Sequence, residues 1–124
     1  MIRYGVPPYL ECSTRGFTPF SAFCAHVRDE QGNYRSIESV YQAAKIFEDG
    51  STGLTWREAK GRKAVNQNYC AALYSRLWDL YMQQNPALLP TLLEATGLSD
   101  IFGQPGHVCQ ATELWRIRQN HTHR

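Results

Sequence analysis

The chain has 124 residues, of which 43 % are apolar and 19 % are charged. This length suits one domain with a single core, and the composition excludes a disordered chain and a repeat array. The formal net charge of +2 is too small to indicate nucleic-acid binding by electrostatics alone. No apolar run approaches the ~20 residues of a membrane span, and no secretion signal follows Met1. We therefore expect a soluble domain in the cytoplasm, without a membrane partner.

The N-terminal part of the chain predicts a coil followed by a hairpin. Residues 1–19 are rich in proline, glycine, serine and threonine, which favours irregular coil laid over the core. Residues 20–28 have mixed apolar character, residues 29–33 form a turn, and a return strand begins at Tyr34. This order predicts a small β-hairpin.

Two helices are predicted next. The first covers residues 36–47, with Ser36 as its N-cap and apolar residues at the spacing of one buried face, and residues 49–53 end it. Thr55 and Glu58 then have the spacing of a capping box. We expect a second, short helix to begin there and to close near Gly61.

The longest helix is predicted for residues 69–83, where two apolar stripes run side by side. Its members are Tyr69, Leu73, Leu77 and Leu80 in one stripe and Cys70, Tyr74, Trp78 and Tyr81 in the other. So wide an apolar band predicts a helix at the centre of the core. The aromatic residues could instead form a stacking platform for bases, although helical spacing favours the core.

The C-terminal third is also predicted to be mainly helical. Residues 85–97 form a helix with a kink or restart at Pro90 and Gly97 as its C′ residue. A loop over residues 98–108 leads to a last helix over residues 110–119. His121 and His123 lie in a polar, frayed tail over residues 119–124.

The four cysteines are spread widely, with no Cys-x-x-Cys pair, and we expect free thiols: Cys12, Cys24, Cys70 and Cys109. The pairs Cys24–His26 and His107–Cys109 could together offer two sulfurs and two nitrogens to a tetrahedral zinc ion. Neither spacing is usual for zinc, so we expect no metal site.

One polar stripe on the first helix could carry chemistry. Glu38, Gln42 and Lys45 follow one another at i, i+4 and i+7, with Tyr41 at the edge of the stripe. A carboxylate, an amide and an amine on one rigid face could supply an acid or base, a hydrogen-bonding group and a nucleophile or clamp. Arg62 could add a contact to an anion. The alternative is a solvated helix face.

The run Gly32-Asn33-Tyr34-Arg35-Ser36-Ile37-Glu38-Ser39-Val40-Tyr41-Gln42-Ala43-Ala44-Lys45 resembles the signature of the NADAR (YbiA-like) superfamily. In that family a Gly-containing turn and an aromatic residue precede Ser/Thr-x-Glu, an aromatic residue, Gln-Ala and Lys. Four further pieces are similar in the same order, at residues 20–23, 59–62, 84–97 and 114–118. The resemblance covers about residues 16–118, which leaves residues 1–15 and the tail outside it.

The chain also departs from the family pattern. Ala22 stands where the family usually has Asn, and the family's Trp before the long helix falls near Asn66. The family's Asp-x-x-Trp-Gly is reduced to Asp100-Ile101-Phe102-Gly103, and its closing piece is not evident at residues 108–111. These departures indicate a compact, divergent branch, such as one encoded by a bacteriophage, whose protein would act in the host cytoplasm.

The resemblance implies a fold class and an activity. The fold is α+β and predominantly helical, with a small β-hairpin packed on a helical core in one domain, residues 1–124. The activity is that of an N-glycosidase, a hydrolase of ribosyl–nitrogen bonds that needs neither metal nor cofactor. Its substrate would be ADP-ribose on a guanine-type base or a related phosphorylated nucleotide, with free nucleotide, DNA and RNA all open as carriers.

The resemblance also assigns roles to residues that match the motif. Glu38 would act as general base or stabilise the oxocarbenium ion, and Lys45 would attack the sugar aldehyde or hold phosphate. The remaining residues would bind substrate. Gln42 and Ser21 would bind the ribose hydroxyls, Phe20, Phe23 or Tyr41 would stack on the base, and Arg62 would contact the phosphate. Asp100, the first residue of the reduced segment at 100–103, would also bind substrate.

Two further hypotheses stay open. The weakened motif pieces favour a non-catalytic module that binds ADP-ribose, a nucleotide or a host protein on the same scaffold. A generic helical adaptor would instead have no nucleotide affinity and a charge-paired Glu38 face.

Overall fold

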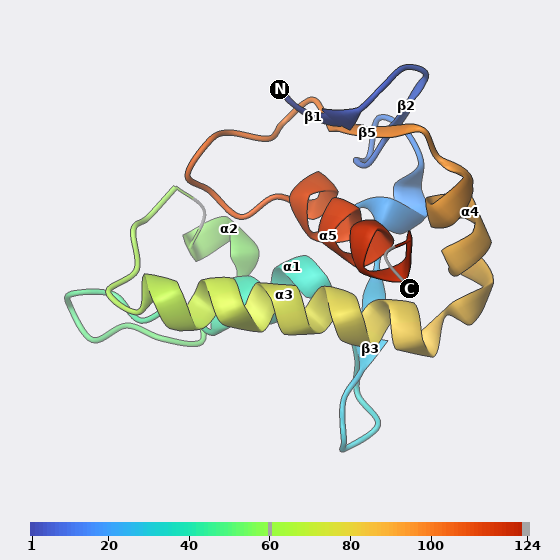
Figure 1. Ribbon diagram of the computed structural model, residues 1–124. Helices are drawn as coiled ribbons and strands as arrows, with labels where there is room; N and C mark the ends of the chain where they lie inside the picture. The colour runs from blue at the N-terminus through green and yellow to red at the C-terminus, as the bar shows by residue number, and fades with distance from the viewer. Residues whose placement is uncertain (60, 123–124) are drawn as a thin grey trace.

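A computed structural model describes residues 1–59 and 61–122, and there helices and two small sheets form an α+β domain (Figure 1). The sheets lie apart: one contains the N-terminal strand, and the other is a hairpin that projects past the longest helix (Figure 1). Lys60, within the motif piece at 59–62, and His123 lie outside the described residues. No helix in the described ranges has the length and apolar character needed to cross a membrane.

Two strands form within the N-terminal residues, so the prediction of irregular coil for residues 1–19 is wrong at residues 2–5 and 9–11. β1 (Ile2–Gly5) pairs antiparallel with β5 (Gly97–Asp100), and β2 (Tyr9–Glu11) pairs parallel with the other edge of β5. A short 3₁₀ helix, η1 (Thr18–Phe20), follows. Backbone hydrogen bonds to a strand far along the chain order these residues, and residue composition does not report such bonds.

β5 also corrects two predictions for the C-terminal third. Gly97 begins this strand and is not a helix C′ residue, and the predicted loop at 98–108 begins as a strand instead. All four residues of β5 are buried. A Cβ atom on Gly97 would lie 2.5 Å from the carbonyl oxygen of Val6, so only glycine lets the chain approach so closely there.

The predicted hairpin is confirmed by β3 (His26–Arg28) and β4 (Tyr34–Ser36), which pair antiparallel. Val27 points into the core. The Gln84 side chain holds the hairpin, because its Oε1 accepts from the Arg28 backbone N–H and its Nε2 donates to the Arg28 carbonyl, both at 2.9 Å. The amide thus replaces a neighbouring strand for one residue of β3.

α1 (Ile37–Ala43) begins where predicted, with Ser36 as its N-cap: the hydroxyl oxygen accepts from the Ser39 backbone N–H at 3.1 Å. The helix ends at Ala43 and not at Phe47. Asn66 provides the reason, since its side chain donates to the Ala44 carbonyl at 3.0 Å and accepts from the Ile46 N–H at 2.9 Å. These bonds satisfy backbone groups that a longer helix would otherwise have paired.

The short helix α2 (Trp56–Ala59) has the predicted capping box. Thr55 Oγ1 accepts from the Glu58 backbone N–H at 3.3 Å, and it also donates to Glu58 Oε1 at 2.8 Å. The helix packs against α1.

α3 (Gln67–Gln84) is the central helix, as predicted, but only one of the two predicted stripes is fully buried. Its buried residues are Cys70, Tyr74, Leu77, Trp78, Tyr81 and Met82. Tyr69 is 57 % exposed, which is incompatible with a place in the core. The band is narrower than predicted because α1, α5 and the hairpin contact only part of the helix.

After α3 the chain makes a 3₁₀ turn, η2 (Pro86–Leu88), and restarts as α4 (Leu89–Glu94), so the predicted restart at Pro90 is confirmed. The last helix, α5 (Gln110–Thr122), continues past residue 119. His121 therefore lies in a helix and not in a frayed tail, with Nδ1 3.0 Å from the Ile117 carbonyl oxygen. α5 lies between the three-stranded sheet and α3 and contacts both (Figure 1).

Candidate functional site

α1 carries three of the predicted site residues, Glu38, Tyr41 and Gln42, and Lys45 follows two residues after its end at Ala43. Glu38, Tyr41, Gln42 and Lys45 are half-buried or buried, which differs from a fully solvated helix face. Gln42 Nε2 donates to Glu38 Oε1 at 2.8 Å. The carboxylate of Glu38 is thus oriented by its neighbour one turn along the helix.

The amide oxygen of Gln42 has no hydrogen-bond partner among the residues that the structure describes. The side chain is only 6 % exposed, and Oε1 is buried without a hydrogen bond. A buried acceptor left unpaired costs about 1–3 kcal/mol, so buried polar atoms are normally satisfied by protein, water or ligand. Since the Gln42 NH₂ group is engaged with Glu38, this oxygen can recognise only a donor, such as a hydroxyl group.

Lys45 lies against the aromatic part of the same face. Its Nζ is 5.1 Å from the centroid of the Tyr41 ring, and Tyr41 packs edge-on against Tyr74 of α3 at 5.1 Å. Burial lowers the pKa of the Lys45 ammonium, while the charge of Glu38 and the nearby Cys70 thiol oppose this effect. The amine is therefore more readily deprotonated than an exposed lysine, a property that a nucleophilic amine requires.

A chain of hydrogen bonds connects the start of α1 to the start of α5 and the end of β5. The Glu38 backbone N–H donates to the Ala22 carbonyl at 3.0 Å. The Ala22 N–H donates to Gln110 Oε1 at 2.8 Å, and Gln110 Nε2 donates to Asp100 Oδ2 at 3.2 Å. Both the Gln110 and Asp100 side chains are buried. We call these three bonds the Ala22–Gln110–Asp100 chain.

Asp100 is the anchor of this chain. Its carboxylate also accepts from the Phe102 backbone N–H at 3.0 Å and from the Cys109 thiol at 3.4 Å. Burial raises the pKa of Asp100, partly offset by these donors. The structure therefore places this predicted substrate-binding residue inside the domain, 3 % exposed, with protein groups around its oxygens.

The other predicted substrate-binding residues lie at different depths. Phe20 and Ser21 are fully buried, with Phe20 packed edge-on against Phe17 and Ser21 Oγ accepting from the Phe23 N–H at 3.3 Å. Phe23 is 42 % exposed. Arg62 forms an ion pair with Asp49 at 3.4 Å, and its guanidinium lies 4.1 Å from the centroid of the ring of residue 47. These two partners of Arg62 lie in the segment after α1 and not on the Glu38 face.

Gln110 is the residue that sequence reasoning missed. It stands at the start of a predicted helix, where a glutamine is ordinarily solvated, and nothing in its spacing marks it as buried. Its bonds to Ala22 and Asp100 join segments 88 and 10 residues away.

The cysteines are free, and Cys12, Cys70 and Cys109 are buried. Within the described ranges no group of three or more His, Cys, Asp or Glu side chains could hold a metal ion.

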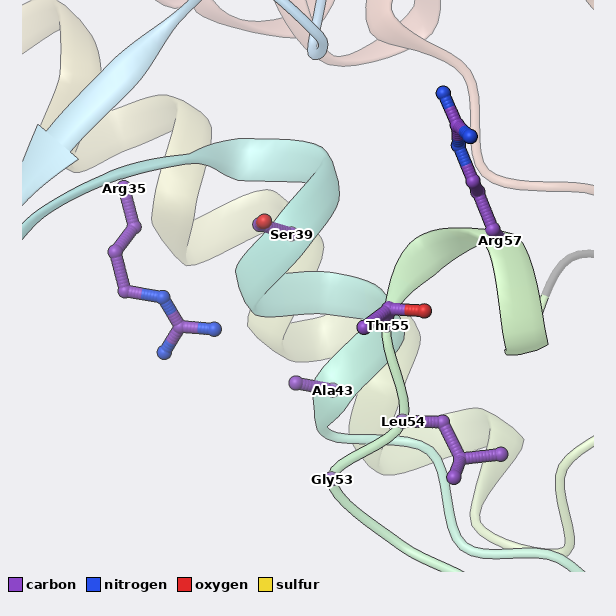
Figure 2. A pocket seen from close by; sticks show the side chains of 7 residues that line it. All are labelled: Arg35, Ser39, Ala43, Gly53, Leu54, Thr55 and Arg57. Carbon is purple, nitrogen blue, oxygen red and sulfur yellow. The ribbon is translucent and has the colours of Figure 1, made fainter.

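Two hollows open near α1 and the hairpin. One, of about 390 Å³, is lined by Arg35, Ser39, Ala43 and residues 53–55 and 57 (Figure 2). The other, of about 580 Å³, lies between residues 28–31 and Leu80 and Gln84. None of the predicted site residues lines either hollow.

The chain matches no model of a known protein family and no curated protein.

Proposed function

We propose that the protein is an N-glycosidase that hydrolyses a ribosyl–nitrogen bond, with ADP-ribose on a guanine-type base or a related nucleotide as substrate. The observation that carries this proposal is the face of α1, where Gln42 orients the Glu38 carboxylate at 2.8 Å and presents a buried, unpaired oxygen beside it. The family resemblance of the segment that contains these residues supports the same activity.

The reaction needs little from the protein beyond charge and orientation. The bond from the anomeric carbon to the base nitrogen breaks, its electron pair leaves with the base, and positive charge builds on the sugar. Glu38 would stabilise this charge, and water would add its oxygen to the anomeric carbon and deliver a proton to the base. Gln42 Oε1 would accept a hydrogen bond from a ribose hydroxyl, which supplies the missing donor.

Lys45 would contribute in one of two ways. With its pKa lowered by burial, the neutral amine could condense with the open-chain aldehyde of the released sugar, forming an imine with loss of a water molecule. As an ammonium it would hold a substrate phosphate. Lys45→Met removes the amine and its charge but retains an apolar chain that can pack against Tyr41, so a loss of activity in Lys45→Met would distinguish either role from simple packing.

The experiment incubates the protein with ADP-ribosylated guanosine, as nucleoside and in a DNA oligonucleotide, and follows the products by mass spectrometry. We expect the wild type to release ADP-ribose, and Glu38→Gln to reduce the rate by about 10²–10³-fold. Glu48→Gln is the matched control, because Glu48 is an exposed carboxylate in the loop after α1. An unchanged rate in Glu38→Gln would refute the assigned role.

The departures from the family pattern near Asn66 and at residues 100–103 favour a second candidate, a module that binds ADP-ribose or a nucleotide without cleaving it. Calorimetry that shows tight binding of ADP-ribose, with no product after long incubation, would support this candidate over the hydrolase.

A further inference from the structure

Lys45 lies beyond the end of α1, and a side chain at the start of α3 holds the backbone on both sides of it. The Lys45 N–H donates to the Gln42 carbonyl at 3.3 Å, which is longer than usual. Asn66 makes two shorter bonds to the neighbouring residues: its Nδ2 donates to the Ala44 carbonyl at 3.0 Å, and its Oδ1 accepts from the Ile46 N–H at 2.9 Å. The start of α3 therefore fixes the backbone at Lys45 more firmly than α1 does.

Asn66 is the N-cap residue of α3, but its side chain does not cap that helix. Asparagine at this position ordinarily accepts a hydrogen bond from a backbone N–H in the first turn of its own helix. Here the side-chain oxygen accepts from the Ile46 N–H and, at 3.5 Å, from the Cys70 thiol. The Val65 N–H adds to this contact by donating to the Ile46 carbonyl at 2.7 Å. A local preference given up in this way indicates that the amide serves the segment around Lys45.

Aromatic packing holds the other end of the Lys45 side chain. Its Nζ lies 5.1 Å from the centroid of the Tyr41 ring, and Tyr41 packs edge-on against Tyr74 of α3. The titratable groups around the amine are Glu38 and Tyr41 of α1 and Cys70 of α3. Burial lowers the pKa of Lys45 against the effects of Glu38 and Cys70. Burial also raises the pKa values of Tyr41 and Cys70, so both stay neutral near neutral pH and Glu38 supplies the negative charge.

We propose that Asn66 is a positioning residue for the Lys45 amine: by bonding to the backbone on both sides of Lys45, it holds Nζ over the Tyr41 ring. A lysine side chain is long and flexible. A mobile backbone at this position would let the amine turn into water, where burial no longer lowers its pKa. This role rests on the proposed function, in which the amine attacks the aldehyde of the released sugar. Asn66 acts through Lys45 and takes no part in bond formation.

The test is reductive trapping of the amine in the full chain, with ribose 5-phosphate as the aldehyde. The amine nitrogen attacks the carbonyl carbon, the carbonyl oxygen leaves as water, and cyanoborohydride transfers hydride to the imine carbon to give a stable secondary amine. Mass spectrometry of peptides measures the rate at Lys45 and, in the same molecule, at the exposed Lys63. We expect the wild type to react faster at Lys45 than at Lys63 near neutral pH, with a half-maximal rate at lower pH.

Two variants of Asn66 test its role. Asn66→Ala removes both bonds and should slow trapping at Lys45 about tenfold, since a misplacement of about 1 Å can cost about 10²-fold. The pH midpoint at Lys45 should also rise toward that of Lys63, a change that a purely structural role would not produce. Asn66→Asp keeps an acceptor for the Ile46 N–H, so its maximal rate at Lys45 should lie between those of the wild type and Asn66→Ala, while its added charge raises the midpoint. Thermal unfolding followed by circular dichroism verifies that both variants are folded.

Asn68→Ala is the matched control, because Asn68 is an exposed asparagine of α3 two residues away, and it should leave both rates unchanged. Equal rates at Lys45 and Lys63 in the wild type, a wild-type rate and midpoint at Lys45 in folded Asn66→Ala, or the same loss in Asn68→Ala would each overturn the proposal. Trapping does not require turnover. A wild type that releases no ADP-ribose, together with slower trapping in Asn66→Ala, would therefore refute the N-glycosidase and support the role of Asn66, whereas turnover with unchanged trapping in Asn66→Ala would do the opposite.

Discussion

Replacing Gln110 by leucine tests whether the Ala22–Gln110–Asp100 chain stabilises the domain. Leucine removes the bond at 2.8 Å to the Ala22 N–H and the bond at 3.2 Å to Asp100, while both partners stay buried. Each buried group left without its partner costs about 1–3 kcal/mol, and leucine regains part of this by its apolar contacts. We therefore expect the free energy of unfolding to fall by about 2–4 kcal/mol, which lowers Tm by about 6–20 °C for a chain of this size.

Thermal unfolding followed by circular dichroism measures this loss, with Gln104→Leu as the control. Gln104 is an exposed glutamine in the loop before α5, and its replacement should change stability by less than about 0.5 kcal/mol. Hydrogen exchange gives a local readout, since the Ala22 amide should lose its protection in Gln110→Leu. A loss below about 0.5 kcal/mol, with the Ala22 amide still protected, would show that these bonds do not stabilise the domain.

Three further predictions concern single positions. Burial raises the pKa of Asp100 above its unfolded value, so its contribution to stability is fully present below the unfolded pKa of about 4 and is lost as pH rises through the folded pKa. In urea unfolding between about pH 3 and pH 7, the decrease of the free energy of unfolding with rising pH should therefore be smaller in Asp100→Asn than in the wild type. Ser36→Ala should lower the free energy of unfolding by about 1 kcal/mol through loss of the N-cap, whereas Ser36→Asp should retain most of it. Gly97→Ala places a Cβ atom 2.5 Å from the Val6 carbonyl oxygen, and the resulting loss of the β1–β5 pairing should appear as faster amide exchange in both strands.

Local signals in the sequence predicted the local structure well. The Ser36 N-cap, the Thr55–Glu58 capping box and the restart at Pro90 depend on residues a few positions apart, and each is present in the structure. These interactions form within one helical turn, so spacing alone is enough to identify them.

The three-stranded sheet could not be predicted in the same way. β2 has three residues, and β5 is buried throughout although it contains Ser99 and Asp100, so neither strand shows an alternating apolar pattern. The pairing joins the N-terminus to a strand near the end of the chain, and no local spacing reports it. The roles of Gln110 and Asp100 could not be predicted for the same reason, because Gln110 bonds to Ala22 and Asp100 pairs with Ile2, both distant in the sequence.

For the site, the sequence predicted the face of α1 but not its surroundings. Glu38 and Gln42 share one face of α1 because helical geometry requires it, whereas Lys45 lies beyond the end of the helix at Ala43, so the predicted spacing i+7 does not place it. The depth of Phe20 and Ser21 and the pairing of Arg62 with Asp49 depend on tertiary packing, which spacing does not contain.

The most direct test of the account is the single-turnover rate at which the protein releases ADP-ribose from ADP-ribosylated guanosine, for the wild type, Glu38→Gln, Gln42→Leu and the control Glu48→Gln. The account predicts release by the wild type and Glu48→Gln, a loss of about 10²–10³-fold in Glu38→Gln, and a smaller loss in Gln42→Leu, which removes the orienting hydrogen bond. Release by Glu38→Gln at the wild-type rate, or no release by any of the four folded proteins, would contradict it.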